Sequence, residues 1–156
     1  MARILRLGPL VLALAGCVLL VAAEFSTLTS VQVITVRKGS ITGGEHHTYA
    51  LAIIAVAAAL MAWAATVGGS RPATWALLAL AAAALGVVLL VDLPAVSEEG
   101  LVGTLYEQAK ASPEIGFYLE SAGAVVLFFA GVARLVLGPV AVAERTDRRD
   151  AAVTPA

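Results

Sequence analysis

Four apolar segments, each long enough to cross a membrane, divide the chain at residues 5–23, 49–67, 74–91 and 121–137. Each segment is close to the 17–25 residues that a helix needs to cross a bilayer. The last three contain no Asp, Glu or Lys, and their one Arg is Arg134, near the end of the fourth. The pattern predicts an all-α membrane fold, an antiparallel four-helix transmembrane bundle within residues 1–140, with the fourth helix over 117–137.

The polar residues between these segments predict the connections. Residues 31–36 are rich in β-branched side chains and predict a strand, followed by a turn at 37–40 and a return strand at Ile41. This first loop is therefore expected to form a small extracytoplasmic β-hairpin. In the inner turn, Ser70 is placed to cap the third helix and Pro72 to lie in its first turn.

The remaining boundaries follow from proline and glycine. Pro94 is expected to stop the third helix, and residues 105–111 to form a short amphipathic helix. The fourth helix is expected to start near Pro113 and to end at Gly138-Pro139. Residues 141–156 are polar and predict a disordered cytoplasmic tail.

Composition agrees with a membrane protein. Apolar residues make up 60% of the chain and charged residues 13%, against about 45–50% and 25% in soluble domains. Pairs of small residues four apart lie on the second and third segments, at Ala55/Ala59, Ala58/Ala62, Ala79/Ala83 and Ala82/Gly86. This spacing predicts close helix packing in lipid.

Arginine and lysine fall unequally on the two sides of the predicted bundle. Seven lie on the side of the termini and three in the two long loops; they are Arg3, Arg6, Arg71, Arg134, Arg145, Arg148 and Arg149, against Arg37, Lys38 and Lys110. The positive-inside rule therefore predicts that both termini are cytoplasmic, in a multi-pass protein of the plasma membrane. Abundant Arg and Ala are common in bacteria with GC-rich genomes.

Cys17 leaves two interpretations of the first segment open. Residues 14–17, Leu-Ala-Gly-Cys, match the site at which bacterial lipoproteins are cleaved and lipidated. The apolar run continues beyond Cys17 to Ala23, which favours an uncleaved transmembrane helix. In that case Cys17 packs as a small apolar residue.

The topology brings polar residues together at the outer ends of the four helices. They are Glu24, Glu45, His46, His47, Tyr49, Asp92, Tyr118 and Glu120. His46, His47, Asp92 and Glu120 are weak candidates for a divalent-metal site, since imidazole and carboxylate suit zinc and similar ions. A proton-titrating site or an ordinary polar rim are the alternatives. Neighbouring His46 and His47 would point about 100° apart on a helix, which argues against both binding one ion.

Glu120 is the one acidic residue expected inside a membrane helix. Lipid exposure of a carboxylate costs several kcal/mol, so Glu120 is expected to face the other helices. Its expected partners are His46 or His47 and the Tyr49 hydroxyl. The segments contain no midplane charge and no broken helix, which argues against a channel or a secondary transporter. Nucleophile–base, zinc-protease and phosphate-loop motifs are missing, which disfavours an enzyme.

Four short motifs resemble small four-helix integral membrane proteins of unknown function from actinobacteria. They are His46-His47-Thr48-Tyr49, Gly69-Ser70-Arg71-Pro72, Asp92-Leu93-Pro94 and Gly116-Phe117-Tyr118-Leu119-Glu120, and the similarity runs over most of residues 24–138. In helix order and loop sizes the layout is also similar to tryptophan-associated membrane proteins. The four-helix, β-loop layout is shared by claudins as well, but the paired loop cysteines and the Trp motif of that family are missing. The resemblance implies a plasma-membrane protein with four spans, but no activity or catalytic residues.

Three function classes follow from these features. The first is a non-enzymatic accessory or scaffold subunit whose acidic outer loops meet a partner. The second is a metal-, proton- or small-ligand-responsive membrane protein that uses the outer polar residues. The third is an enzyme on a lipid-soluble substrate. The bilayer is the expected partner, with another membrane protein or a second copy possible in addition; no nucleic acid or cofactor is expected.

Overall fold

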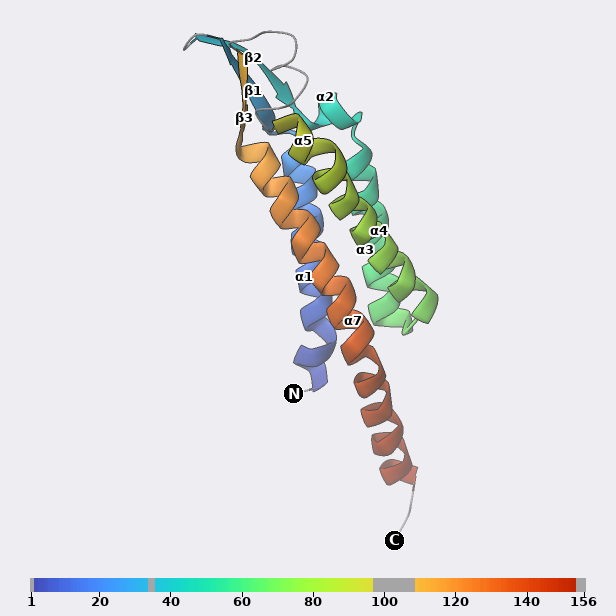
Figure 1. Ribbon diagram of the computed structural model, residues 1–156. Helices are drawn as coiled ribbons and strands as arrows, with labels where there is room; N and C mark the ends of the chain where they lie inside the picture. Colours follow the sequence, from blue (N-terminus) through green and yellow to red (C-terminus); the bar gives the residue numbers. More distant parts are fainter. Residues whose placement is uncertain (1, 34–35, 97–108, 154–156) are drawn as a thin grey trace.

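Four long helices form a bundle with a small sheet at one end (Figure 1). The computed structural model describes the backbone of residues 2–33, 36–96 and 109–153, and side chains within 7–30, 40–96 and 112–138. The long helices are α1 (Ala2–Glu24), α3 (Ala50–Gly68), α4 (Arg71–Val87) and α7 (Ile115–Val153). The first residues of α1 and the last of α7 lie at the end away from the sheet.

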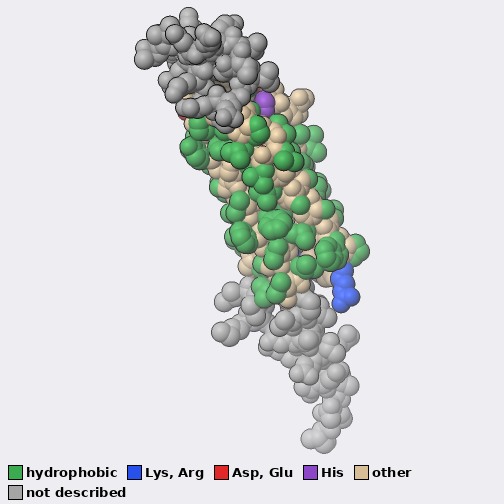
Figure 2. Space-filling view, in the orientation of Figure 1, with side chains coloured by type: hydrophobic (Ala, Val, Ile, Leu, Met, Phe, Trp, Pro, Cys, Tyr) green, Lys and Arg blue, Asp and Glu red, His purple; other side chains and the backbone are tan. Residues whose placement is uncertain are grey.

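The helices pack in a closed ring and expose apolar side chains outward. Helix α1 contacts α3 and α7, and α4 contacts the same two helices. The core consists of small and aliphatic residues, while large apolar side chains such as Val18, Ile53, Leu90 and Phe129 are exposed. Figure 2 shows this apolar surface along the middle of the described part. Each helix is long and apolar enough to span a bilayer, so the chain is a multi-pass membrane protein.

The small sheet has three antiparallel strands in the order β2-β1-β3: β1 (Thr27–Val33), β2 (Val36–Thr42) and β3 (Ala109–Pro113). The predicted hairpin is confirmed, but Val33 pairs with Val36, so β2 runs through the residues expected to form the turn. Positions 34–35 lie outside the described residues. The chain therefore reverses within the β-branched run, and residues 37–40 are extended because they pair with β1.

Strand β3 corrects the interpretation of the second loop. Residues 109–111 were expected in an amphipathic helix, but they pair with β1, where Ala111 lies opposite Val31; positions 105–108 lie outside the described residues. Helix α7 then starts at Ile115 rather than at Pro113. Pairing with a distant strand satisfies the backbone groups of β1, and a local helical pattern cannot anticipate that pairing.

The third helix does not stop at Pro94. After Val87 it continues through a π-helix, η1 (Val88–Asp92), and one α turn, α5 (Leu93–Val96). Proline clashes with the carbonyl four residues earlier in a regular α-helix. The wider π turn before Pro94 changes that spacing, so the helix continues past Pro94 instead of ending there.

The start of α4 agrees with the sequence, whereas the end of α7 does not. The Ser70 hydroxyl accepts a hydrogen bond from the Ala73 amide at 3.3 Å, and Pro72 lies in the first turn. Helix α7 continues through Gly138 and Pro139 to Val153, over most of the tail expected to be disordered. Ala, Glu and Arg dominate this tail and favour a helix strongly enough to continue it.

The closest helix contact joins α1 to α7 through two glycines. A Cβ atom on Gly16 would lie 2.9 Å from the Leu127 amide nitrogen, and one on Gly123 would lie 3.0 Å from the Gly16 carbonyl oxygen. Among the predicted small-residue pairs, Ala55, Ala58 and Ala62 are buried as expected. In α4 the predicted faces were wrong, because the members at positions 79, 82 and 83 are exposed. Leu77 and residues 81 and 84 face the core instead.

Arg134, the one Arg in the last three apolar segments, is held inside the bundle. Its side chain is buried, and its guanidinium donates a hydrogen bond to the Ala65 carbonyl near the end of α3. The last carbonyls of a helix have no partner within the helix, and the negative end of its dipole attracts a cation. Cys17 is buried in the core of the bundle, where it packs as an apolar residue.

Candidate cation site at the sheet end of the bundle

Two histidines lie on a short helix that the sequence did not separate from the second span. Helix α2 (Gly43–His47) follows β2 and ends with His46 and His47. Thr42 and Glu45 form a capping box: the Glu45 amide donates to the Thr42 hydroxyl at 3.3 Å, and the Thr42 amide donates to the Glu45 carboxylate at 3.0 Å. The short helix is thereby fixed at its start.

The same hydrogen bonds act on the charge of Glu45. Donation from the Thr42 backbone and hydroxyl stabilises the carboxylate, which lowers the pKa of Glu45 below its usual value. A carboxyl with a lowered folded-state pKa supports folding above its unfolded pKa and loses that support as the pH falls through the folded value. The cap of α2 is therefore intact at neutral pH and weakens in acid. Glu45 is exposed and does not belong to the group of His46, His47 and Asp92 described below.

A sharp backbone bend separates α2 from α3. Thr48 and Tyr49 both have left-handed backbone angles, with φ of 53° and 60°. Such angles are uncommon outside glycine, and each costs of order 1–3 kcal/mol unless the surroundings hold it. The imidazoles at the end of α2 approach Asp92, the last residue of η1. After the bend, α3 enters the bundle.

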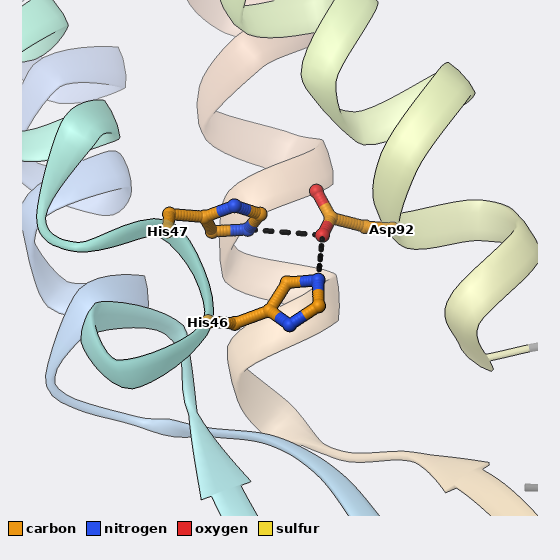
Figure 3. Close-up of side chains that lie close together, drawn as sticks. All are labelled: His46, His47 and Asp92. Carbon is orange, nitrogen blue, oxygen red and sulfur yellow. Dashed lines mark ion pairs between the residues drawn. The ribbon is translucent and has the colours of Figure 1, made fainter. Parts of the chain in front are cut away.

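Three side chains from two distant parts of the chain, His46, His47 and Asp92, point toward one another, as Figure 3 shows. His47 Nε2 lies 2.9 Å from Asp92 Oδ1, and His46 Nε2 lies 3.6 Å from the same oxygen. The potential ligand atoms of His46, His47 and Asp92 all lie within 4.8 Å of one another. A fourth group approaches from α7, since Glu120 Oε2 lies 3.8 Å from His47 Nε2.

Burial distinguishes this cluster from a solvated polar rim. The side chains of Asp92 and Glu120 are 0% and 1% exposed, and that of His47 is 7% exposed. The polar neighbours of these atoms are one another: His47 Nε2 and Asp92 Oδ1 form an ion pair, and a side-chain hydrogen bond joins Asp92 to Glu120. Buried polar atoms almost always have partners, and here imidazole and carboxyl groups from three helices serve as partners for one another.

The π-helix provides the position of Asp92. It is the last residue of η1, directly before Leu93, and its carboxylate is fully buried. A π turn shifts the following residues around the helix axis relative to a regular helix, and such turns occur frequently at functional sites. The irregular turn therefore directs Asp92 toward the two histidines rather than toward lipid.

The structure confirms that Glu120 faces inward, and it corrects the expectations about the two histidines and about Tyr49. Glu120 faces inward, next to His47, as predicted. The two imidazoles nevertheless both reach one oxygen of Asp92, so the argument from their 100° separation was wrong: α2 ends at His47, and the long side chains converge. Tyr49 is half exposed, with its ring centroid 6.0 Å from that of Phe25, so the expected contact of its hydroxyl with Glu120 is replaced by ring packing.

Three distances in the cluster are close to those between the ligands of a tetrahedral metal ion. Two ligand atoms bonded to zinc at about 2.0–2.1 Å and at the tetrahedral angle lie about 3.3 Å apart. The two His–Asp distances and the His47–Glu120 distance, 2.9, 3.6 and 3.8 Å, lie around that value. Two imidazoles and two carboxylates are a ligand set that zinc and related divalent ions accept.

Sequence reasoning found the ligand candidates and missed what arranges them. Glu24 was counted as one member of the polar rim, but it is 1% exposed and binds the start of α3. The left-handed pair Thr48–Tyr49 and the π-helix carry no clear sequence signal, because neither contains glycine and Pro94 alone predicts an end rather than a π turn. Tyr118 is exposed, as expected for the membrane interface.

No protein-family model, curated protein or solved structure matches this chain. The resemblance to small actinobacterial four-span proteins therefore stays a prediction. The structure shows a multi-pass membrane protein in which His46, His47 and Asp92 converge at the sheet end of the bundle.

Proposed function

We propose that this multi-pass membrane protein binds one divalent cation of the zinc class at the sheet end of its bundle, and responds to that ion. His46, His47 and Asp92 are the ligands, and Glu120 completes the set. The observation that carries the proposal is the convergence of one ligand atom each from His46, His47 and Asp92 within 4.8 Å, beside the fully buried Asp92 carboxylate. This choice favours a metal-responsive protein over a scaffold subunit.

The charge of the cluster supports a divalent ion. Asp92 and Glu120 are buried carboxyl groups; Glu120 is removed from water and lies close enough to Asp92 to feel its charge. Several kcal/mol are lost for each charge that is buried without compensation. A bound divalent cation supplies two positive charges at the point where the carboxylate and imidazole atoms meet, and neutral imidazoles are the form that binds metal.

The exposure of His46 gives the ion a route to its ligands, and the charge pattern of the chain indicates the side of the membrane from which the ion comes. The His46 side chain is 32% exposed, so an ion can reach it from the aqueous phase at the sheet end. The excess of Arg and Lys near the termini supports an extracytoplasmic location for the sheet in the plasma membrane. The ion would then come from outside the cell.

The proposal is tested by metal titration of the purified protein in detergent. Wild-type protein stripped with a chelator should take up one equivalent of Zn²⁺ per chain. The double variant His46→Ala/His47→Ala should take up none. Glu114→Gln, which changes a carboxyl outside the cluster, is the control and should bind like wild type. Equal zinc uptake by wild type and the double variant would exclude this site.

A second test addresses orientation. In a Cys17→Ala background, a cysteine introduced at Ser40 in β2 should react with a membrane-impermeant maleimide in intact cells. A cysteine at Ser70, in the turn between α3 and α4, should react only after the cells are opened, because the basic side of the bundle faces the cytoplasm. Labelling of the Ser70 position in intact cells would place the sheet inside and reverse the proposed topology.

A further inference from the structure

Glu24, the last residue of α1, holds the start of a different helix. Its Oε1 accepts hydrogen bonds from the amides of Leu51 at 2.9 Å and Ala52 at 3.2 Å. The first amides of a helix have no partner within it. Tyr49, which precedes α3, provides no side-chain cap. Glu24 therefore caps α3 from α1, with hydrogen bonds that its charge strengthens.

The segment before α3 is attached to the same point. A Cβ atom on Gly43, the first residue of α2, would lie 2.9 Å from the Ala23 carbonyl oxygen and 3.1 Å from Glu24 Cα. The Gly43 amide also donates to the Ser26 carbonyl at 3.2 Å. Both ends of the segment that carries the two histidines are thus fixed to the end of α1, at Gly43 and at Leu51.

Between these two attachments lies the left-handed pair Thr48–Tyr49. Strained backbone of this kind persists only where neighbouring contacts hold it. If the attachment at Leu51 is lost, the bend can relax toward ordinary backbone angles. The imidazoles of His46 and His47 would then move relative to Asp92, which belongs to another helix.

We propose that Glu24 is a positioning residue of the cation site, which fixes the bend that directs His46 and His47 toward Asp92. The inference rests on the proposed function, because cation affinity is its main readout. Glu24 lies outside the group of converging ligand atoms and acts through the amides of α3. What matters is the reach of its side chain and an acceptor oxygen at its end.

Two conservative variants separate this role from a role of the charge. Glu24→Gln keeps the length and the acceptor oxygen but removes the charge. Glu24→Asp keeps the charge but is shorter by one methylene, so it no longer reaches the amides of Leu51 and Ala52. In zinc titrations of the full chain in detergent, Glu24→Gln should bind within about threefold of wild type. Glu24→Asp should bind about 10-fold more weakly, in the range that loss of a ligand-orienting group costs.

Amide exchange of the metal-free proteins provides a readout that does not depend on zinc. The Leu51 and Ala52 amides should exchange slowly in wild type and Glu24→Gln, and faster in Glu24→Asp. Ser70→Ala removes the cap of α4 at the other end of the bundle and is the matched control. It should lower stability but leave zinc affinity unchanged.

Results that differ from these expectations contradict the role of Glu24 in distinct ways. Tighter binding by Glu24→Asp than by Glu24→Gln would show that the charge of Glu24, not its position, supports the ion. An equal loss of affinity in Ser70→Ala would trace the effect to general destabilisation. If wild type binds no zinc, the proposed function fails, and fast exchange confined to Glu24→Asp would still establish the anchoring of the bend. Unchanged exchange in Glu24→Asp would refute the anchoring itself.

Discussion

Replacing Asp92 by Asn is expected to weaken zinc binding by about 100-fold or more, beyond the 10- to 100-fold that loss of an orienting group costs. Asp92 offers the oxygen that both imidazoles approach, at 2.9 and 3.6 Å. An amide oxygen is a neutral and weaker ligand than a carboxylate, and the change leaves the buried charge of the ion less compensated. Competition of the purified variant against a chelator of known affinity measures the loss.

In the absence of metal, Asp92→Asn should not lower the unfolding temperature. The substitution removes a buried negative charge next to the Glu120 carboxyl, and the amide oxygen can still accept a hydrogen bond from His47. Zinc at a free concentration 100 times the wild-type dissociation constant should stabilise wild type by about 2.7 kcal/mol and the variant by about 0.4 kcal/mol or less. Stabilisation of both proteins to the same extent would mean that zinc binds elsewhere.

Glu120→Gln should also weaken zinc binding, but less than Asp92→Asn. Glu120 Oε2 is 3.8 Å from His47 Nε2, further than Asp92 Oδ1. Loss of this fourth ligand should weaken zinc binding by about 10-fold, near the lower end of the range for groups that support a metal site, while the protein keeps its fold. Zinc affinity indistinguishable from that of wild type would reduce the set to His46, His47 and Asp92.

The largest stability effect is expected where α1 meets α7. Gly16→Ala should destabilise the bundle by about 1–3 kcal/mol, the usual range for overpacking a tight contact. The added methyl group would lie 2.9 Å from the Leu127 backbone nitrogen and 3.0 Å from the Gly123 carbonyl oxygen. Backbone atoms cannot rotate away as a side chain can, so the two helices must separate. Unfolding of the purified protein in sodium dodecyl sulfate, followed by circular dichroism, measures the change.

The same helix offers a matched control with a much smaller expected effect. A Cβ atom on Gly8 would meet nothing within 4 Å. Alanine favours a helix over glycine, whereas Pro9 restricts a preceding residue that carries a Cβ, so Gly8→Ala should change stability by less than about 1 kcal/mol. If Gly16→Ala and Gly8→Ala shift the transition equally, the close approach of α1 and α7 does not contribute to stability.

Membrane architecture was predictable because it depends on local sequence. A helix in lipid satisfies its own backbone hydrogen bonds, so length and apolarity alone identify each span. The four long helices, the hairpin and the Ser70 cap follow from residues close together in the chain. The inward orientation of Glu120 was predictable for the same reason, since lipid excludes a carboxylate wherever the helix lies.

Tertiary structure alone decided how the polar residues meet. The sequence placed His46, His47, Asp92 and Glu120 at one end of the bundle, but helical geometry on a single helix argued that the two histidines could not share an ion. Their convergence requires the end of α2, the left-handed bend and the π-helix, which depend on contacts between distant segments.

The role of Glu24 and the pairing of β3 have the same origin. Glu24 caps amides 27 and 28 residues further along the chain, and β3 pairs with β1 across most of the sequence. A backbone group needs a partner, but the residues near it do not reveal which distant group provides one. The amino-acid sequence by itself therefore determined a four-span membrane protein with acidic and imidazole groups at one end. The packing of the helices brought those groups together.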